Sequence, residues 1–199
     1  LLTGGVCSNT GATHTKRNYN TRVFWTSDVS GNGIQLGWRE LDSAMKALLD
    51  AGDNQGKKRL EHLMGDTAYD GAVVSPSSSI FRKRKGILGD IVHAGTAVVG
   101  PPNKVTQYST NATWKDRLHG GTSPESITGA QSYAGFASVY NTRQNIAYVG
   151  ANDGFLHGFR AGAYDASGKN FVKNDAAKPN DGHEVLAYMP RSVLSRIHS

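Results

Sequence analysis

Apolar side chains are most concentrated between residues 145 and 159, where two short runs flank a polar turn. The runs carry β-branched and aromatic residues, among them Ile146, Tyr148 and Phe155, which favour strands. Between them, Asn152-Asp153-Gly154 holds residue types that accept left-handed backbone angles at little cost. The pattern predicts a β-hairpin. Apolar residues occupy adjacent as well as alternate positions, so we expect neither face of the hairpin to be fully exposed to water, as suits a strand between two layers.

A hairpin of this kind, with glycines on either side, is typical of a β-propeller blade, although any buried hairpin would give the same pattern. The composition also favours β structure, because 24 of the 199 residues are glycine. Such a content indicates many turns and short strands rather than long helices. We therefore expect a mainly β fold with a few short helices.

Two amphipathic helices are predicted before the hairpin. Apolar residues from Leu41 to Leu49 recur at three- and four-residue spacing, which places them on one helix face. Asp42 or Ser43 would cap the first turn. A second, shorter helix is expected at 57–64.

The remaining elements are short. In chain order, we expect strands at 23–26, 34–38, 87–93, 97–100 and 184–189, a turn at 30–33, and a last helix that starts at Pro190. Two polar stretches interrupt them. One is a long excursion at 103–130, with Tyr108 and Trp114 as candidate anchors, and the other is an insertion at 165–181 that we expect to be mobile.

The charge distribution and the cysteine count bear on two questions: whether the protein binds nucleic acid, and whether a disulfide forms within the chain. The net charge is +6, scattered apart from the run Arg82-Lys83-Arg84-Lys85. No aromatic stacking platform lies beside this run, so we interpret it as a solvated edge and expect no nucleic-acid partner. Cys7 is the single cysteine, which excludes a disulfide within the chain. It is either a free thiol or pairs outside this chain.

No apolar run approaches the roughly 20 residues of a membrane span, and no signal-peptide pattern is visible. The first residue is Leu1 rather than Met, which indicates an excised piece of a longer protein.

Metal and catalytic patterns are weak. Asp28-Val29-Ser30-Gly31-Asn32-Gly33 has oxygen ligands at alternate positions and glycine at the sixth, as in a calcium loop. Its twelfth position is Arg39 instead of a bidentate glutamate, with Glu40 one place late, so a hairpin turn is the better interpretation. His93 and His157 both fall on predicted strands and could meet, but we interpret them as structural histidines rather than a metal pair.

Several stretches together carry a resemblance. They are, in chain order, Trp38 followed by the 41–49 helix, Leu63-Met64-Gly65-Asp66, Phe81-Arg82-Lys83-Arg84, Ile87-Leu88-Gly89-Asp90-Ile91-Val92-His93, Tyr148-Val149-Gly150-Ala151-Asn152-Asp153-Gly154-Phe155-Leu156-His157-Gly158-Phe159 and Ala187-Tyr188-Met189-Pro190. In this order they resemble the C-terminal domain of the PilY-type tip adhesins of type IV pili. The resemblance covers roughly residues 23 to 197.

The resemblance implies a modified, quinoprotein-like β-propeller at the pilus tip or outer membrane of a Gram-negative bacterium. Residues 1–22 would be a linker or frayed segment, and 23–199 the entry segment and first blades of an incomplete propeller. The implied function is non-enzymatic: adhesion, pilus assembly and control of pilus retraction in twitching motility. Implied partners are other pilus tip proteins (minor pilins) and host or abiotic surfaces.

The resemblance also implies which residues form the structural motif, and it shows where this sequence differs from the family pattern. The structural motif residues are Gly89, Asp90, Gly150, Asn152, Asp153 and Gly154. Family members bind calcium through an acidic loop, and no convincing copy lies in this chain. Arg160 stands where the family commonly has an acidic residue, which exchanges an acceptor for a donor-only side chain. The 165–181 insertion is either a recognition loop or surface decoration.

Two alternative functions remain open. A quinoprotein-like propeller enzyme would share the fold and calcium, but its usual vicinal cysteine pair cannot form with Cys7 alone. Gly-x-Ser-x-Gly, His-Glu-x-x-His and phosphate-loop patterns are absent from the sequence, so no catalytic residue is assigned. The other alternative is a generic propeller scaffold for protein partners.

Overall fold

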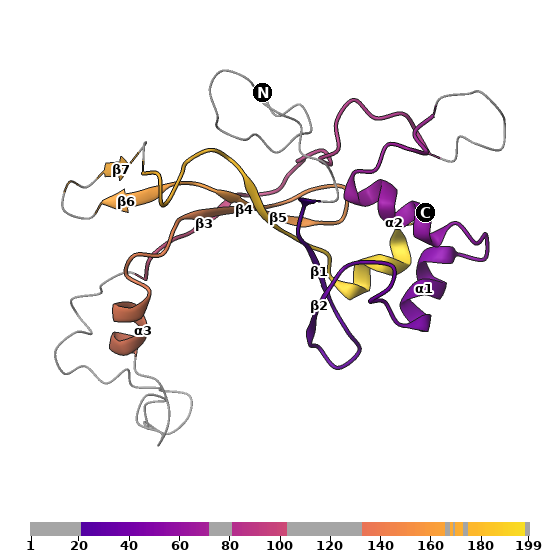
Figure 1. The fold of residues 1–199 in the computed structure, drawn as a ribbon, viewed down its shortest axis with the longest axis horizontal. Helices are drawn as coiled ribbons and strands as arrows, with labels where there is room; N and C mark the ends of the chain where they lie inside the picture. Colours follow the sequence, from indigo (N-terminus) through magenta and orange to yellow (C-terminus); the bar gives the residue numbers. More distant parts are fainter. Residues whose placement is uncertain are drawn as a thin grey trace.

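The computed structural model describes residues 21–71, 81–102, 133–165, 168, 170–172 and 175–197. Its centre is a six-stranded sheet (Figure 1). The strands lie in the order β2 (Gly33–Gln35), β1 (Phe24–Ser27), β8 (Glu184–Tyr188), β5 (Leu156–Arg160), β4 (Ile146–Gly150) and β3 (Ala97–Val99). β1 and β8 run parallel, and the other neighbouring pairs are antiparallel. The sheet thus joins strands from opposite ends of the chain.

The central hairpin is the one that the sequence predicts. β4 and β5 pair from Ile146 opposite Arg160 to Gly150 opposite Leu156. Gly154 has a φ of +85°, a left-handed conformation that glycine adopts without steric cost. The carboxylate of Asp153 accepts a hydrogen bond from the backbone N–H of Phe155, which completes the turn.

The predicted helices near 41–50 and 57–64 are confirmed. α1 (Ser43–Asp50) starts after Asp42, whose carboxylate accepts a 2.7 Å hydrogen bond from Met45 N. α2 (Gly56–Met64) ends at Gly65, which has a φ of +113°. The last helix is a 3₁₀ helix, η4 (Arg191–Arg196), and Pro190 precedes it as the cap. A further helix, α3 (Tyr133–Val139), was not predicted.

The core lies between one face of the sheet and α1, α2 and η4 (Figure 1). A row of paired residues crosses this face, from Phe24 through Ala187 and His157 to Val149. All four side chains are buried. Leucines and methionines of the helices pack against this row, so burial of these apolar side chains stabilises the fold at roughly 1.5–3 kcal/mol each.

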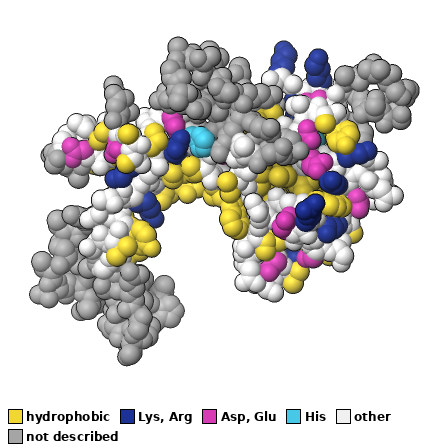
Figure 2. All heavy atoms as spheres, in the orientation of Figure 1, with side chains coloured by type: hydrophobic (Ala, Val, Ile, Leu, Met, Phe, Trp, Pro, Cys, Tyr) yellow, Lys and Arg dark blue, Asp and Glu magenta, His cyan; other side chains and the backbone are white. Residues whose placement is uncertain are grey.

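The opposite face of the sheet is apolar and largely uncovered by the helices. The adjoining row runs through Trp25, Tyr188 and Leu156, and Val23 precedes Trp25 on the same face. Val23, Trp25 and Leu156 are each about 40% exposed. Figure 2 shows hydrophobic side chains gathered along the middle of the molecule, where the strands lie. Within the described residues neither face of the hairpin is fully exposed, as expected, but the helices cover only one of the two faces.

The strand predicted at 87–93 is wrong. Within the described range 81–102, only β3 is a strand, as predicted for 97–100. Residues 87–90 cross the hairpin turn instead of pairing along a strand. The backbone N–H of Gly89 donates to the carboxylate of Asp153, and the carbonyl of Asp90 accepts from Asn152 N. These partners replace the hydrogen-bond ladder that a strand would need.

The polar stretch after β5 contains an ordered β-ribbon. β6 (Ala163–Asp165) and β7 (Asn170–Val172) form a separate two-stranded antiparallel sheet, which projects from the end of the six-stranded one (Figure 1). We call β6 and β7 the ribbon. Arg160 forms an ion pair with Asp181 at its base.

The fold class is mixed, with a β-sheet at the centre and a few helices beside it. No closed propeller is seen in the residues that the structure describes. Other predictions lie outside them. These are residues 1–20 of the predicted 1–22 linker, the thiol of Cys7, and the 103–130 excursion with Tyr108 and Trp114. Arg22, at the end of the predicted linker, is described and is buried.

Candidate functional site

Hydrogen bonds connect four buried side chains next to the central hairpin, and we call these four residues the charge network. They are Arg22, Glu184, His157 and Asp153. Arg22, just before β1, donates from Nε and Nη2 to both carboxylate oxygens of Glu184 on β8, at 2.5 and 2.7 Å. Its remaining guanidinium nitrogen, Nη1, donates to the carbonyl of Met64 at 2.8 Å. This bidentate pair is almost fully buried, and it fixes the end of α2 against the sheet.

His157 lies at the centre of the charge network. Its Nδ1 is 2.7 Å from Glu184 Oε1, and its Nε2 is 3.1 Å from Asp153 Oδ2. The side chain has no exposed surface, and its ring stacks near Phe159 at a centroid distance of 5.9 Å. A protonated imidazole donates to both carboxylates, so the four groups Arg22, Glu184, His157 and Asp153 are together electrically neutral.

Asp153 connects the charge network to residues 87–90. Its Oδ2 accepts from the backbone N–H of Gly89 at 2.9 Å. A Cβ at Gly89 would collide with the backbone nitrogen and side chain of Asp153, so only glycine fits this approach. One carboxylate therefore closes the turn, binds His157 and holds a segment 64 residues away.

The environment shifts the pKa values of Glu184, Asp153 and His157 toward the charged form. Burial acts to raise the pKa of Glu184, but hydrogen bonds from Arg22 and His157 outweigh it and lower the pKa. Burial likewise opposes ionisation of Asp153, and the His157 hydrogen bond and charge lower its pKa. Burial acts to lower the pKa of His157, and the hydrogen bonds to Asp153 and Glu184 raise it.

The structure brings five of the six predicted motif residues together. Gly89 and Asp90 meet the turn formed by Asn152, Asp153 and Gly154. The sixth, Gly150, lies at the end of β4 opposite Leu156, with open space where a Cβ would point. His93 is exposed at a φ of +56° and is no partner of His157.

Sequence reasoning missed Arg22 and Glu184. Both charged residues border apolar runs that form buried strands, and that position was the available signal. Charged side chains are almost never fully buried unless they are paired. His157 alternates with the buried Phe155 on the same strand face, which also pointed to a buried and paired histidine.

A groove lies next to the charge network. Its volume is about 730 Å³, and its lining runs from His62 and Leu63 of α2 through residues 82–90 to Asn152 and Asp153. Arg84 anchors the outer wall. Its guanidinium donates to the carbonyls of His62 and Asp66, both at 2.7 Å. Burial and then the charge of Arg84 lower the pKa of His62.

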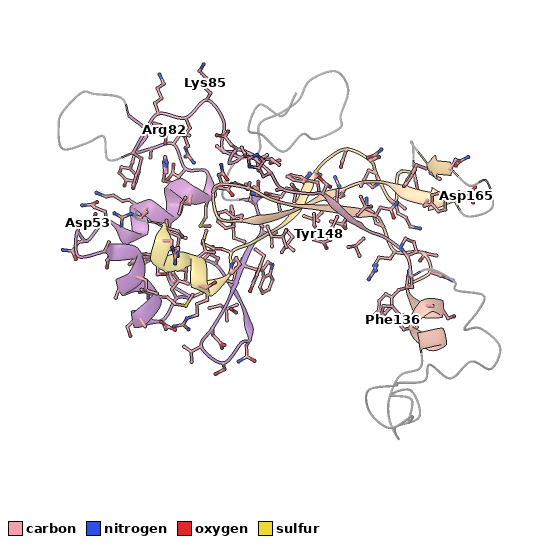
Figure 3. All side chains as sticks on the ribbon, turned by 180° about the vertical axis from the view of Figure 1, so that it is seen from behind. Asp53, Arg82, Lys85, Phe136, Tyr148 and Asp165 are labelled. Atoms are coloured by element: carbon pink, nitrogen blue, oxygen red, sulfur yellow. The ribbon has the colours of Figure 1, made fainter. Side chains whose placement is uncertain are left out.

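The remaining basic residues of the run border the groove. Arg82, Lys83 and Lys85 are exposed, as expected for a solvated edge, whereas Arg84 is partly buried and paired. Figure 3 shows Arg82 and Lys85 on the loop beside α2, with side chains that point away from the sheet.

The Asp28 carboxylate, in the loop that partly resembles a calcium site, accepts hydrogen bonds within its own turn. Asp28 Oδ1 accepts from Ser30 N and Asn32 N, and Oδ2 accepts from the Asn32 side chain. Both oxygens thus serve the turn between β1 and β2. Across the described ranges, no group of three or more histidine, cysteine, aspartate or glutamate side chains could hold a metal ion.

The charge network lacks the features of an acid–base catalytic centre. Both nitrogens of His157 are engaged with carboxylates, and its ring has no contact with solvent. A general base needs a free lone pair within reach of a substrate proton. The arrangement instead holds five segments of the polypeptide relative to one another. They are the start of β1, the end of α2, residues 87–90, the hairpin turn with β5, and β8.

The structure is therefore a β-sheet unit that buried ion pairs hold together, and one face of its sheet is apolar and not covered by the helices. The chain is similar to proteins named type IV pilus biogenesis factor PilY1. It is 30% identical over 149 residues to that of Pseudomonas aeruginosa strain PAK, and 35% identical over 146 residues to that of strain UCBPP-PA14. It is 31% identical over 140 residues to the PilY1 homolog of Xylella fastidiosa strain Temecula1.

These matches cover 75%, 73% and 70% of this chain. The chain is therefore a relative of the PilY-type proteins, and the resemblance seen in the sequence is confirmed. The matches span only 9%, 9% and 8% of the relatives' own lengths. No family model and no solved structure matches the chain. No helix among the described residues is long and apolar enough to cross a membrane.

Proposed function

We propose that this chain is a β-propeller segment of a type IV pilus biogenesis factor that acts at the pilus tip or cell surface without catalysis. The observation that carries the proposal is the 30–35% identity to PilY1 proteins over about three quarters of the chain. In this proposal the protein supports pilus assembly, opposes retraction and adheres to surfaces. Its partners are other pilus tip proteins and the surface to which the pilus attaches.

The uncovered sheet face supports the propeller part of the proposal. Trp25, Tyr188 and Leu156 present a continuous apolar row on the side away from the helices. A propeller blade buries both faces against its neighbours, and a soluble monomer rarely leaves an extended apolar patch in water. A neighbouring blade is the occupant that such a face fits. Calcium belongs to this proposal only at a site outside the described residues.

The ribbon is the proposed contact surface. It projects beyond the six-stranded sheet, and it displays Tyr164 and Phe171, which are 45% and 62% exposed. The two rings are directly opposite each other on the two strands, with centroids 5.2 Å apart. Aromatic side chains at such positions are enriched in protein contact sites. The 103–130 excursion remains a second proposed contact surface.

Deletion of residues 166–180 from the parent protein tests this role. The deletion removes β7 but none of the strand pairs of the six-stranded sheet. We expect normal protein level and surface piliation, with reduced adhesion or twitching motility. A milder variant, Tyr164→Ser with Phe171→Ser, should give the same defect. The matched control is Val29→Ser, which removes an exposed apolar side chain at the β1–β2 turn.

The result that would contradict the contact role is normal adhesion and motility in both ribbon variants. Loss of the protein after deletion would mean that the ribbon belongs to the folding core. Deletion of the whole gene separates the pilus function from a generic scaffold, because only the former predicts a loss of surface pili. A redox-dye assay with added quinone, in which reduction of the dye would overturn the non-catalytic assignment, tests the enzyme alternative.

A further inference from the structure

The groove beside α2 has the size and composition of a ligand site. Its volume of about 730 Å³ falls within the range of pockets that bind small ligands. The apolar side chains Leu63, Ile87 and Leu88 lie along it. The exposed cations Arg82, Lys83 and Lys85 border it, and none of them forms an ion pair within the described residues.

The wall that carries these cations is held in place. The backbone of Phe81 bonds to Tyr69 and Gly71, and its ring stacks on His62 at a centroid distance of 4.4 Å. At the far end, Asp153 holds Gly89. A groove that is fixed before binding avoids the entropic cost of ordering its own walls.

One donor on this wall has no acceptor. Arg84 uses its two terminal nitrogens on carbonyls of the α2 end and on Asp70. Its Nε is buried and has no hydrogen-bond partner in the described part of the chain. A buried donor without an acceptor is costly.

We propose that this groove binds an extended acidic segment of a partner polypeptide, with its carboxylates along residues 82–85 and its apolar side chains over Leu63 and Leu88. The cations follow one another along residues 82–85, and Figure 3 shows Arg82 and Lys85 at separate places on this loop. This spread matches a polymer with repeated carboxylates better than one compact anion. Asp90 is exposed at the opposite end, so the acidic residues of the partner occupy the end near Arg82.

The test is fluorescence anisotropy of the 199-residue chain with a labelled peptide that alternates glutamate and leucine. A glutamine–leucine peptide of the same length is the neutral probe. We expect the acidic peptide to bind at low salt and to weaken as salt rises, since screening acts on exposed charges. The neutral peptide should bind at least tenfold more weakly.

Three variants locate the site. The triple variant R82E/K83E/K85E should weaken binding of the acidic peptide at least tenfold. Leu88→Trp fills the groove without a change of charge and should weaken it about as much. The matched control Arg39→Glu reverses an exposed cation on the turn after β2 and should leave binding within twofold. Circular dichroism of each variant confirms that it is folded.

Four results would overturn the proposal. Equal binding of both peptides would exclude recognition of charge. An unchanged affinity in Leu88→Trp, or an equal loss in Arg39→Glu, would show diffuse attraction by the net charge of +6 instead of a groove. Binding to anionic phospholipid vesicles without binding to the peptide would assign the basic edge to a membrane surface. None of these results bears on the proposed pilus function, which is tested separately by piliation and adhesion.

Discussion

The carboxylate of Asp153 accepts a 2.9 Å hydrogen bond from the backbone N–H of Gly89, and no larger residue fits at position 89. This contact joins the turn of the central hairpin to the segment that lines the groove. The same carboxylate bonds to His157, so the buried charges and the groove wall share one residue. A change at either end of this contact should therefore affect the stability of both.

Gly89→Ala tests the close approach. A methyl group would meet the backbone of Asp153, which cannot give way without opening the turn. We expect a loss of about 1–3 kcal/mol in the free energy of unfolding, measured by urea denaturation. Gly95→Ala is the control, because open space surrounds that position. Equal stability of the two variants would show that residues 87–90 do not pack on the turn.

Gly154→Val tests the turn itself. The φ of +85° is unfavourable for a β-branched residue, and a Cβ there would lie 2.9 Å from Val193 Cγ1. Backbone strain and this clash should together lower the melting temperature by several degrees, since about 1 kcal/mol shifts it by roughly 2–8 °C in domains of ordinary size. Gly154→Ala should lose less. A melting temperature equal to that of the unaltered chain would contradict the observed backbone conformation.

The buried histidine predicts how stability depends on pH. Asp153 and Glu184 face His157 directly, and Arg22 faces Glu184. The folded-state pKa of His157 is raised above its ordinary value of about 6.5. Its contribution to stability is therefore fully present below pH 6.5 and is lost as the pH rises through the folded pKa. The slope approaches about 1.4 kcal/mol per pH unit for one proton.

His157→Gln should remove this dependence. The difference in free energy of unfolding between the two proteins should be largest near pH 6 and shrink at higher pH, measured by urea denaturation at several pH values. Other titrating groups, such as His62, contribute to both proteins and cancel. NMR titration of the His157 ring in the unaltered chain gives a check that does not rely on the variant. A ring that titrates at or below pH 6.5 would contradict the charge assignment.

Local pattern was enough to predict the hairpin, both helices and the strand that became β8. In each case the signal was a periodic run of apolar residues bounded by a cap or a glycine, as at Asp42 and Gly65. The strand at 87–93 failed because its apolar run looks like a strand, whereas its hydrogen bonds go to a turn far along the chain. Tertiary contacts decide such segments, and they leave no local trace.

The same limit applies to the site. Asp153 and Gly154 were identified from turn chemistry. Arg22 and Glu184, which are connected to Asp153 through His157, lie 131 and 31 residues away from Asp153 in the sequence, and only the sheet order brings them together. The parallel pairing of β1 with β8 places Arg22 beside Glu184. No periodicity encodes that pairing. A buried arginine–glutamate pair becomes predictable only when the strand order is known.

Arg160 and Asp181 carry the last prediction, which concerns the base of the ribbon. Arg160 Nε donates to Asp181 Oδ1 at 2.9 Å, and Nη2 donates to Oδ2. The Asp181 carboxylate is 6% exposed. Burial acts to raise its pKa, and the hydrogen bond from Arg160 lowers it. The stabilisation is thus present above the ordinary aspartate pKa and is lost as the pH falls through the lowered one.

Arg160→Ala should destabilise the chain by about 1–2 kcal/mol at neutral pH, because it leaves a mostly buried carboxylate without its cation. Asp181→Asn should cost less, since no buried charge remains. The double variant should show a coupling of about 0.5–1.5 kcal/mol, measured by urea denaturation at pH 7. Arg39→Ala, which removes an exposed arginine on the β2 side, is the control and should stay within 0.5 kcal/mol. Additive effects of the two substitutions would mean that the pair does not fix the ribbon to the sheet.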